Sequence, residues 1–290
     1  MGSGALQQRP EEDEAVPRPS FLPLPRDQLR GTERLTVPLG EAINTNGGLK
    51  RTAAGFSYHV PRNFVTWVSR RRWKLYDLEN MSRLRPRRGV ILVSNHRSFF
   101  DMYVAAASVF THGHFIERLF FPVRANFFYD NPAGALVNWI MSGYAMWPPV
   151  FRDERKAALN PIGIQQMAHA LSEPGGVLGI HPEGARQKGS DPYTLGAARP
   201  GVGKLIELCD PETLVLPFFI LGLGNDFVAE VRQRLKSDPG PDIRIHWGTA
   251  LRCGDLCGRC SDAQEIADRL LEVVHELGQR DRAVVSGQAQ

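Results

Sequence analysis

The sequence predicts an α/β protein that forms a single domain, with a mostly buried mixed sheet flanked by helices. Short apolar runs of the buried-strand type recur along the chain and alternate with stretches of helical spacing. Strands that alternate with helices in this way form a sheet covered by helices. The chain of 290 residues, 42% hydrophobic and 23% charged, is long enough to bury such a core.

The expected elements follow in order along the chain. The predicted strands span residues 90–93, 119–123, 177–180, 214–221 and 243–247. The predicted helices span residues 99–109, 133–141, 155–171, 203–208 and 263–277. The last helix has Ile266, Leu270 and Val274 at helical spacing, and Ser261 and Gln264 form a capping-box pattern before it.

The two ends of the chain differ from the middle in composition. Residues 1–55 are rich in Pro, Gly, Glu and Arg and have little periodic apolar pattern, which predicts a disordered or loosely packed extension. The folded domain is expected over residues 56–278, and residues 279–290 are expected to form a C-terminal tail. No repeat interrupts the central part.

The cellular compartment follows from segments that the sequence lacks. The first thirty residues have no apolar core of a signal peptide, and no run of about 18 apolar residues occurs. Four cysteines in an unsecreted chain of this length argue for a reducing compartment rather than a disulfide framework. We therefore expect a cytoplasmic protein without a transmembrane helix.

Basic residues are concentrated between Arg51 and Arg88, where ten Arg and Lys stand against two acids. One interpretation is a solvated basic face. The other is attraction to anionic lipid headgroups, and residues 62–76 have the mixed aromatic and basic composition of an interfacial helix. A helix packed on the domain with its basic residues outward fits that segment equally well. No nucleic-acid-binding motif is present, so nucleic acid is not expected as a partner.

The first group of chemically competent residues follows the predicted strand 90–93. His96 and Asp101 are five residues apart, so they cannot meet if both lie in the middle of one helix. They can meet if Ser98 is the N-cap, because His96 then lies in the entering loop and Asp101 can turn back. The carboxylate would fix the imidazole tautomer and leave the other nitrogen free to take a proton from a hydroxyl. Alternatively, Ser98 and Asp101 form only a helix cap.

Three further segments carry polar or special residues. After the predicted strand 177–180, Gly184 allows close backbone approach, Arg186 can hold a phosphate, and Glu183 can orient a hydroxyl or hold Arg186. A solvated turn is the alternative for this segment. Arg152 ends an apolar stretch and is either a phosphate ligand or a surface cation. Pro217 cannot donate to a ladder, so its strand is expected at a sheet edge or bulge facing an acyl pocket, or as an ordinary strand end.

These four segments, in this order and spacing, resemble the 1-acylglycerol-3-phosphate acyltransferase family of glycerolipid acyltransferases over roughly residues 60 to 275. The family's first block is Asn-His, four residues and Asp, and its third is Phe-Pro-Glu-Gly-Thr-Arg-Ser. The second block ends in an arginine after an apolar run, and the fourth is an apolar strand with proline. The matching residues are Asn95, His96 and Asp101, then Arg152, then Pro182, Glu183, Gly184 and Arg186, and finally Pro217. His181, Ala185 and Gln187 depart from the third block.

The resemblance implies the glycerolipid acyltransferase fold and a reaction. His96 would be the general base and Asp101 its partner, and the acceptor hydroxyl would attack the thioester of acyl-CoA or acyl carrier protein. The implied acceptor is 1-acylglycerol 3-phosphate, giving phosphatidate, at the inner face of the membrane, to which the protein would be peripheral. No metal and no cofactor is expected. The residues implied in substrate binding are Asn95, Ser98, Arg152, Glu183, Gly184, Arg186 and Pro217.

Two alternatives remain at this point. The departures at His181 and Ala185 lie in the block that shapes the headgroup pocket, so the acceptor could instead be glycerol 3-phosphate, another lysophospholipid or a non-phosphate lipid. A catalytically silent lipid-binding protein with the same fold is the alternative from another functional class. The presence of both His96 and Asp101 favours the enzyme.

Three cysteines near the C-terminus have the spacing Cys253-x3-Cys257-x2-Cys260, which occurs in the iron–sulfur motif of radical S-adenosylmethionine enzymes. That class needs a barrel after the motif, and only about thirty residues remain. A partial metal site with His246 would lack a fourth ligand. We therefore predict ordinary loop cysteines before the final helix.

Overall fold

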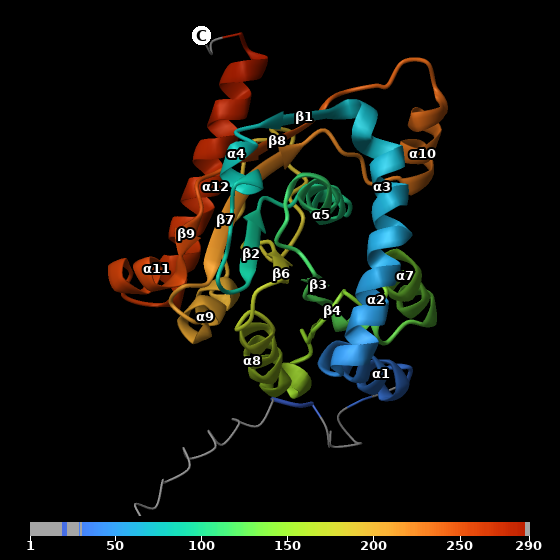
Figure 1. The fold of residues 1–290 in the computed structure, drawn as a ribbon, viewed down its shortest axis with the longest axis vertical. Helices are drawn as coiled ribbons and strands as arrows, with labels where there is room; N and C mark the ends of the chain where they lie inside the picture. The colour runs from blue at the N-terminus through green and yellow to red at the C-terminus, as the bar shows by residue number, and fades with distance from the viewer. Residues whose placement is uncertain (1–18, 22–28, 30, 288–290) are drawn as a thin grey trace, which may run out of the picture.

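The computed structural model describes residues 19–21, 29 and 31–287, and a central sheet runs through the molecule (Figure 1). Its strands, with those of a small second sheet, are β1 (Trp73–Tyr76), β2 (Val90–Ser94), β3 (Arg118–Phe120), β4 (Val123–Arg124), β5 (Pro149–Val150), β6 (Gly176–Ile180), β7 (Leu214–Leu221), β8 (Ile243–Trp247) and β9 (Leu251–Arg252). The main sheet has the order β1-β8-β7-β2-β6-β3, with β9 also paired to β7. Strands β3, β6, β2 and β7 are parallel and β8 runs antiparallel to β7, so the predicted mixed sheet of an α/β domain is confirmed.

Helices surround this sheet and connect its strands. They are α1 (Glu33–Thr45), α2 (Gly47–His59), α3 (Pro61–Ser69), α4 (Glu79–Ser82), α5 (Asp101–His112), α6 (Ala125–Phe128), α7 (Pro132–Ser142), α8 (Asn160–Ala170), α9 (Gly201–Leu208), α10 (Phe227–Leu235), α11 (Cys253–Arg259) and α12 (Ala263–Val285), with short 3₁₀ turns at Arg70–Arg72 and Glu154–Leu159. The expected strand 119–123 is split into β3 and β4, which belong to different sheets. The expected helix 155–171 is divided into a 3₁₀ turn at Glu154–Leu159 and helix α8, which begins at Asn160 and has Pro161 in its first turn.

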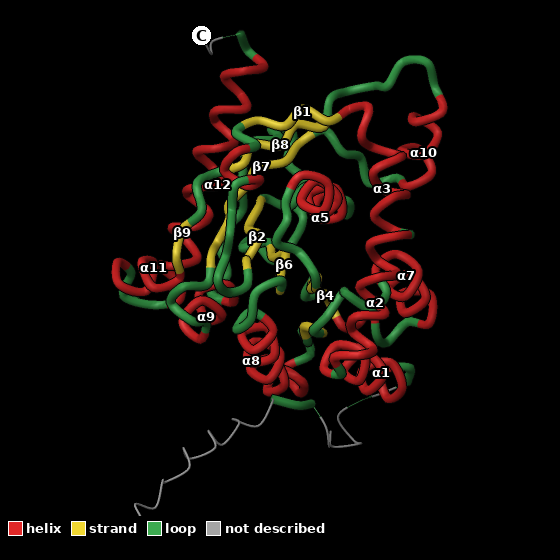
Figure 2. The backbone as a smooth tube through the Cα atoms, in the orientation of Figure 1, coloured by secondary structure: helices red, strands yellow, loops and turns green. Residues whose placement is uncertain are grey.

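Side chains of successive strand residues point to opposite faces of the sheet, and each face packs on its own helices (Figure 2). Val90 and Leu92 of β2 belong to the core beneath α5, whereas Ile91 and Val93 belong to the core beneath α9 and α12. All four side chains are fully buried. This explains why β2 reads as an uninterrupted apolar run rather than as an alternating one.

Pro217 lies in β7, which is a central strand rather than the expected edge strand. On one side β7 pairs with β2 along its length, and Val93 is opposite Pro217. On the other side β7 pairs with β9 at Leu214 and Val215 and with β8 from Phe218 onward. The carbonyl of Pro217 faces this gap between β8 and β9, where it accepts from Gly248 N at 2.8 Å. The missing N–H faces the same gap, so no ladder hydrogen bond is lost.

The N-terminal segment differs from the expected loose extension over residues 1–55, of which the structure describes residues 19–21, 29 and 31–55. Within that described part, α1 and most of α2 are regular helices, and a boundary at residue 56 would fall inside α2. Val37 is fully buried, and Gly40 lies so close to Trp147 that an added Cβ would be 2.7 Å from its ring. These helices are stabilised by tertiary packing, which composition alone does not reveal.

The expected interfacial helix over residues 62–76 ends at Ser69, and residues 73–76 form the edge strand β1 instead. Arg72 is buried, and its guanidinium donates to Glu230, to the Pro241 carbonyl and to the Gly222 carbonyl. Part of the basic segment therefore holds the loops around α10 in place, while Arg70, Arg71 and Lys74 are exposed.

The C-terminal helix is longer than expected. α12 continues to Val285, and Asp281 in the expected tail 279–290 is fully buried. The helix starts one residue later than the predicted capping box, because Asp262 is the N-cap and accepts from the backbone N–H groups of Gln264 and Glu265. Residues 288–290 of the expected tail lie outside the described residues.

Candidate active site

His96 follows β2 directly, at the edge where the parallel strands β2, β6 and β7 have their carboxyl ends. In open α/β sheets this edge is where ligands bind. The imidazole Nδ1 lies 3.6 Å from Asp101 Oδ2, with the side chain of His96 22% exposed and that of Asp101 2% exposed. Nδ1 is buried and has no hydrogen-bond partner in the described part of the chain. The expected approach of His96 and Asp101 is therefore present, at a separation slightly beyond a hydrogen bond.

Asp101 is fixed by the backbone of the loop that carries His96. Its Oδ2 accepts from Arg97 N at 2.8 Å and from Ser98 N at 2.6 Å. Ser98, the N-cap that would let His96 and Asp101 meet, does not cap α5, because the helix begins at Asp101 with Phe100 as N-cap. Asp101 is nevertheless in the first turn and turns back toward His96, as the expected geometry required.

A second imidazole is stacked on the first. The rings of His96 and His181 are parallel within 6°, with centroids 4.0 Å apart. His181 Nδ1 lies 3.1 Å from Ser94 Oγ and 3.2 Å from the Ser94 carbonyl, which anchors the ring to the end of β2. His181, one of the three residues that depart from the third block of the family, thus forms one wall of the His96 site.

Burial dominates the electrostatics of these groups. It lowers the pKa of His96 to about 4, with Arg186 and Arg124 adding to the effect and the backbone hydrogen bond at Ser98 opposing it. Burial also raises the pKa of Asp101 to about 6, against the hydrogen bonds from the backbone. The pKa of His181 is lowered to about 3 by burial and by His96. At neutral pH the site therefore holds two neutral imidazoles and one carboxylate.

Glu183 binds the backbone of the loop that carries His96 and does not hold Arg186. It is buried, with Oε2 accepting from His96 N at 2.8 Å and Oε1 accepting from Gly196 N at 2.7 Å. Burial raises the pKa of Glu183, and both backbone hydrogen bonds oppose that rise. Gly184 follows with φ +63°, the left-handed region that favours glycine, which turns the loop back to donate to the His181 carbonyl.

Three arginines lie next to this loop. Arg152 donates to the Gly184 carbonyl at 2.9 Å, and Arg186 donates to Asn225 Oδ1 at 2.8 Å. The pKa of Arg124 is lowered by burial and then by the charges of Arg152 and Arg186, so the three cations are close enough to repel one another. All three are exposed. A cluster of this kind can bind an anionic group such as a phosphate.

Three of the residues that were expected to bind substrate are buried in the structure. Asn95 is fully buried, and its amide exchanges two 2.9 Å hydrogen bonds with the backbone of Ile220. Ser98 is fully buried, accepts from Phe100 N at 3.1 Å and donates to the Gly224 carbonyl. Pro217 is buried within β7. Asn95 and Ser98 thus fix the His96 loop to β7 and to the loop after it.

Sequence reasoning missed Arg124 and Asn225. Asn225 Oδ1 accepts from Phe99 N at 3.0 Å as well as from Arg186, so it joins the loops after β2, β6 and β7. The available signal was the position of Asn225 just after a predicted strand, at the same sheet edge as His96. Arg124 precedes α6 without any local motif.

The three cysteines expected in a loop before the final helix lie in or next to the short helix α11 instead. Cys253, Cys257 and Cys260 are free thiols in or next to α11, and within the described chain no group of three or more His, Cys, Asp or Glu side chains is arranged to hold a metal ion. His246 is engaged by Asp281 at 3.0 Å and is no partner for the cysteines. None of the helices in the described ranges has both the length and the apolar character needed to span a bilayer.

The mixed α/β sheet carries a histidine close to a carboxylate at the carboxyl edge of its central strands, beside a cationic cluster, and such an arrangement can take a proton from a hydroxyl, as acyl transfer requires. The sequence model of the family named Acyltransferase matches residues 74–221, just over half of the chain, and the chain belongs to this family. The protein is therefore an acyltransferase.

Structural comparison gives the same fold. The chain is similar to the 1-acyl-sn-glycerophosphate (LPA) acyltransferase PlsC from Thermotoga maritima, with a TM-score of 0.51 and 16% sequence identity, covering 81% of this chain and 82% of that one. A search of curated protein sequences found no match. The glycerolipid acyltransferase fold expected from the sequence is thereby confirmed.

Proposed function

We propose that this acyltransferase moves a fatty acyl group from acyl-CoA or acyl carrier protein to the hydroxyl of a lysophospholipid, with 1-acylglycerol 3-phosphate as acceptor and phosphatidate as product. The observation that carries the proposal is the pairing of His96 with Asp101 beside three exposed arginines. The name of the similar Thermotoga maritima enzyme, an acyltransferase of 1-acyl-sn-glycerophosphate, supports the same choice of acceptor.

In the proposed reaction His96 is the general base. Asp101 holds the Nδ1 side of the ring, so that Nε2 takes the proton of the acceptor hydroxyl as its oxygen attacks the thioester carbonyl. The tetrahedral intermediate then expels the thiolate, which receives the proton back from His96. The distance of 3.6 Å would shorten when substrate binds and His96 becomes charged, as is common for catalytic hydrogen bonds. The steps require no metal and no cofactor besides the acyl donor.

The phosphate of the acceptor would be held by Arg186, Arg152 and Arg124, whose mutual repulsion an anion relieves. Glu183 and Gly184 would shape this pocket. The Glu183 carboxylate accepts a hydrogen bond from the His96 backbone N–H, and the Gly184 carbonyl accepts one from the Arg152 guanidinium. Asn95 and Ser98 position His96 through the backbone contacts described above.

The test is release of free thiol from an acyl-CoA in the presence of lysophosphatidate, compared between wild type and His96→Ala. We expect the variant to lose about 10³-fold or more in rate, with an unchanged melting temperature. Equal rates would remove His96 from the chemistry. Parallel assays with glycerol 3-phosphate, lysophosphatidylcholine and a long-chain alcohol identify the acceptor, since only phosphate monoesters should respond to Arg186→Ala.

We further propose that the protein works at an anionic membrane surface on the cytoplasmic side. Exposed apolar side chains gather on α2, α3, α7 and α10, which lie together along one side of the molecule (Figure 1). Trp67 is 44% and Trp139 56% exposed, and exposed arginines such as Arg70 and Arg71 accompany them. Large apolar side chains flanked by cations suit the headgroup region of a bilayer.

Sedimentation with vesicles tests this second proposal. Wild type should bind vesicles of phosphatidylcholine mixed with phosphatidylserine more strongly than vesicles of phosphatidylcholine alone, because anionic lipid attracts the arginines. The double variant Trp67→Ala and Trp139→Ala should lose about tenfold in binding. Leu208→Ala, an equally exposed apolar residue on α9, is the matched control and should bind like wild type. Equal binding by all three proteins contradicts this surface.

A further inference from the structure

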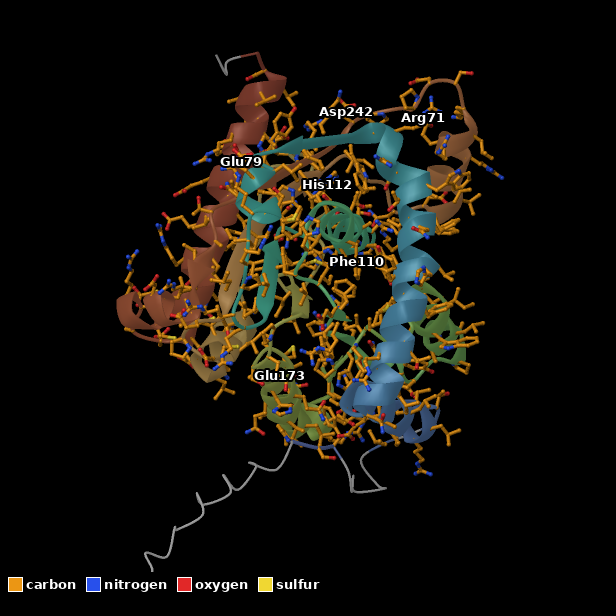
Figure 3. All side chains as sticks on the ribbon, in the orientation of Figure 1. Arg71, Glu79, Phe110, His112, Glu173 and Asp242 are labelled. Carbon is orange, nitrogen blue, oxygen red and sulfur yellow. The ribbon has the colours of Figure 1, made fainter. Side chains whose placement is uncertain are left out.

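A cavity of about 810 Å³ lies far from His96, between α2, α8 and the amino ends of β3 and β6. His96 is at the opposite edge of the sheet, where β2 and β6 end. α5 connects the two regions: Asp101 is at its first residue and Phe110, near its other end, lines the cavity. Nine residues of helix separate them by about 14 Å. Figure 3 shows Phe110 on the side of α5 toward α2, and Glu173 at the end of α8.

The wall of this cavity contains a buried lysine that has no counter-ion among the residues that the structure describes. Lys50 on α2 is 4% exposed, and its Nζ donates to Asn44 Oδ1 at 2.7 Å and to the Leu119 carbonyl at 2.8 Å. Nζ also lies 3.8 Å from the centroid of the Phe120 ring. These partners are all neutral, so they orient the ammonium group without balancing its charge.

The environment of Lys50 is short of negative charge. Burial, together with the nearby Arg118 guanidinium, lowers the pKa of Lys50 to about 7. Arg118 is itself paired with Glu173 at 3.0 Å, but its Nε is buried without a hydrogen-bond partner. An uncompensated buried cation is costly, and an anion brought into the cavity would remove that cost.

The remaining lining indicates what kind of anion fits. Arg51, His59 and His169 add cationic or titratable groups, and Glu117 is the acid besides Glu173. Apolar surface comes from Tyr58, Phe110, Ile116, Phe120 and Trp147. A cavity of several hundred Å³ with aromatic walls and a few polar groups is typical of a small-molecule site rather than of an inorganic ion site.

We propose that this cavity is a second ligand site, separate from the acyl-transfer site, which binds an amphiphilic organic anion: its acidic group faces Lys50 and Arg118, and its apolar body lies against the aromatic side chains. The site is independent of the proposed acceptor, so its test does not rely on enzymatic activity.

Fluorescence titration with 8-anilinonaphthalene-1-sulfonate and with its neutral analogue N-phenyl-1-naphthylamine tests the proposal. Wild type should bind the sulfonate at least tenfold more tightly than the neutral compound, and Lys50→Met should abolish that preference. Equal affinity of wild type for the two compounds would overturn the proposal.

A steric variant separates loss of the site from loss of the fold. A Cβ added at Gly55, which lines the cavity, or at Gly258 on α11 meets nothing within 4 Å, so both positions tolerate a side chain. Gly55→Leu should weaken sulfonate binding about tenfold, whereas Gly258→Leu should leave it unchanged. Arg152→Met should also leave it unchanged, because loss of binding in that variant would place the sulfonate at the cationic cluster near His96.

The pH dependence supplies a third readout. The sulfonate keeps its charge at all relevant pH values, whereas Lys50 loses its proton above pH 7 in the empty cavity. Affinity of wild type should therefore fall about tenfold between pH 7 and pH 9, above the range in which imidazoles ordinarily titrate. Lys50→Met should show no such fall, and a pH-independent affinity in wild type would contradict the role of Lys50.

Discussion

The described part of the chain contains two His–Asp pairs with a buried carboxylate, and they differ in how many hydrogen bonds the carboxylate and the imidazole form. In the pair on β8 and α12, Asp281 accepts from His246 at 3.0 Å, from Arg244 at 2.7 and 2.9 Å, and from Tyr193 at 2.9 Å. In the pair after β2, His96 Nδ1 lies 3.6 Å from Asp101 and has no hydrogen-bond partner. A pair with all its hydrogen bonds formed is typical of a structural role, whereas a pair with a free nitrogen and a partly exposed ring is what the proposed catalysis at His96 needs.

The two carboxyl groups respond to burial in opposite ways. Burial alone raises the pKa of Asp281, but the hydrogen bonds from His246 and Arg244 outweigh it and bring the pKa to about 2. Asp101 has backbone donors and no guanidinium in contact, so burial prevails and its pKa is raised to about 6. The charged form of Asp281 thus stabilises the fold, whereas the charged form of Asp101 destabilises it.

The largest expected effect concerns turnover. Asp101→Asn should lower kcat by about 10²-fold or more, because the amide cannot stabilise the imidazolium formed at His96. Asp281→Asn should keep kcat per folded molecule within about twofold, since it lies outside the His96 site. Thiol-release assays on both variants, normalised to folded protein by circular dichroism, provide the measurement. Equal losses in the two variants would show that the distinction between the pairs is wrong.

The stability of the same two variants at pH 7 should change in opposite directions. Asp281→Asn leaves the partly buried Arg244 guanidinium without its counter-charge and should cost about 3 kcal/mol. Asp101→Asn removes a buried charge while keeping an oxygen that accepts from Arg97 N and Ser98 N, so it should gain about 1–2 kcal/mol. Urea denaturation measures both. A loss of stability in Asp101→Asn would mean that its carboxylate is structural.

The pH dependence of these stability differences sharpens the comparison. Asp281 has a pKa below its ordinary value of 3.8, so its contribution is present above about pH 4 and is lost as the pH falls toward 2. Asp101 has a raised pKa, so its cost is fully present above about pH 6 and disappears below 3.8. The gain in Asp101→Asn should therefore vanish by about pH 3.5, a trend that urea denaturation between pH 3.5 and 7 reveals.

The acid limb of activity follows from the site. The pKa values of about 4 for His96 and about 6 for Asp101 belong to an interacting pair, so kcat/KM should fall as the pH drops from 6 to 4. In Asp101→Asn the remaining kcat/KM should stay constant near pH 6 and fall only at lower pH, where His96 itself gains a proton. A profile that is flat between pH 4 and 6 in wild type would contradict the assignment of the base.

Local pattern was enough for most strands of the main sheet and for the approach of His96 to Asp101. β2, β6 and β7 are apolar runs of strand length, and β8 alternates apolar with polar residues. The spacing of His96 and Asp101 limited their geometry to a loop and a first helical turn. Helices α1 and α2 were missed because their stability comes from contacts such as Gly40 with Trp147, which composition does not encode.

The contacts that shape the site are long-range and were not predictable from spacing. Asn95 donates to the carbonyl of Ile220, 125 residues away, and Ser98 donates to the carbonyl of Gly224, 126 residues away. The sequence does not show these partners, so both side chains were expected to bind substrate. Asp281 and His246 are 35 residues apart on different elements and showed no motif. Sequence indicated which groups can react, whereas tertiary contacts decide which of them are already satisfied.

The smallest expected effect concerns the ring stacked on His96. The third block of the family that the sequence resembles has phenylalanine at the position of His181. A phenyl ring there can keep the parallel stacking on His96 at about the same distance. Because the pKa of His181 is lowered to about 3, it is neutral above pH 4 and supplies shape rather than charge. His181→Phe should therefore keep kcat within about threefold with an unchanged acid limb, whereas His181→Ala should lower kcat about tenfold at constant KM, since His96 loses the surface that orients it. If His181→Phe loses as much as His181→Ala, the imidazole contributes through its hydrogen bond to Ser94 or its proton, and the two rings act as one catalytic unit rather than as a base and its support.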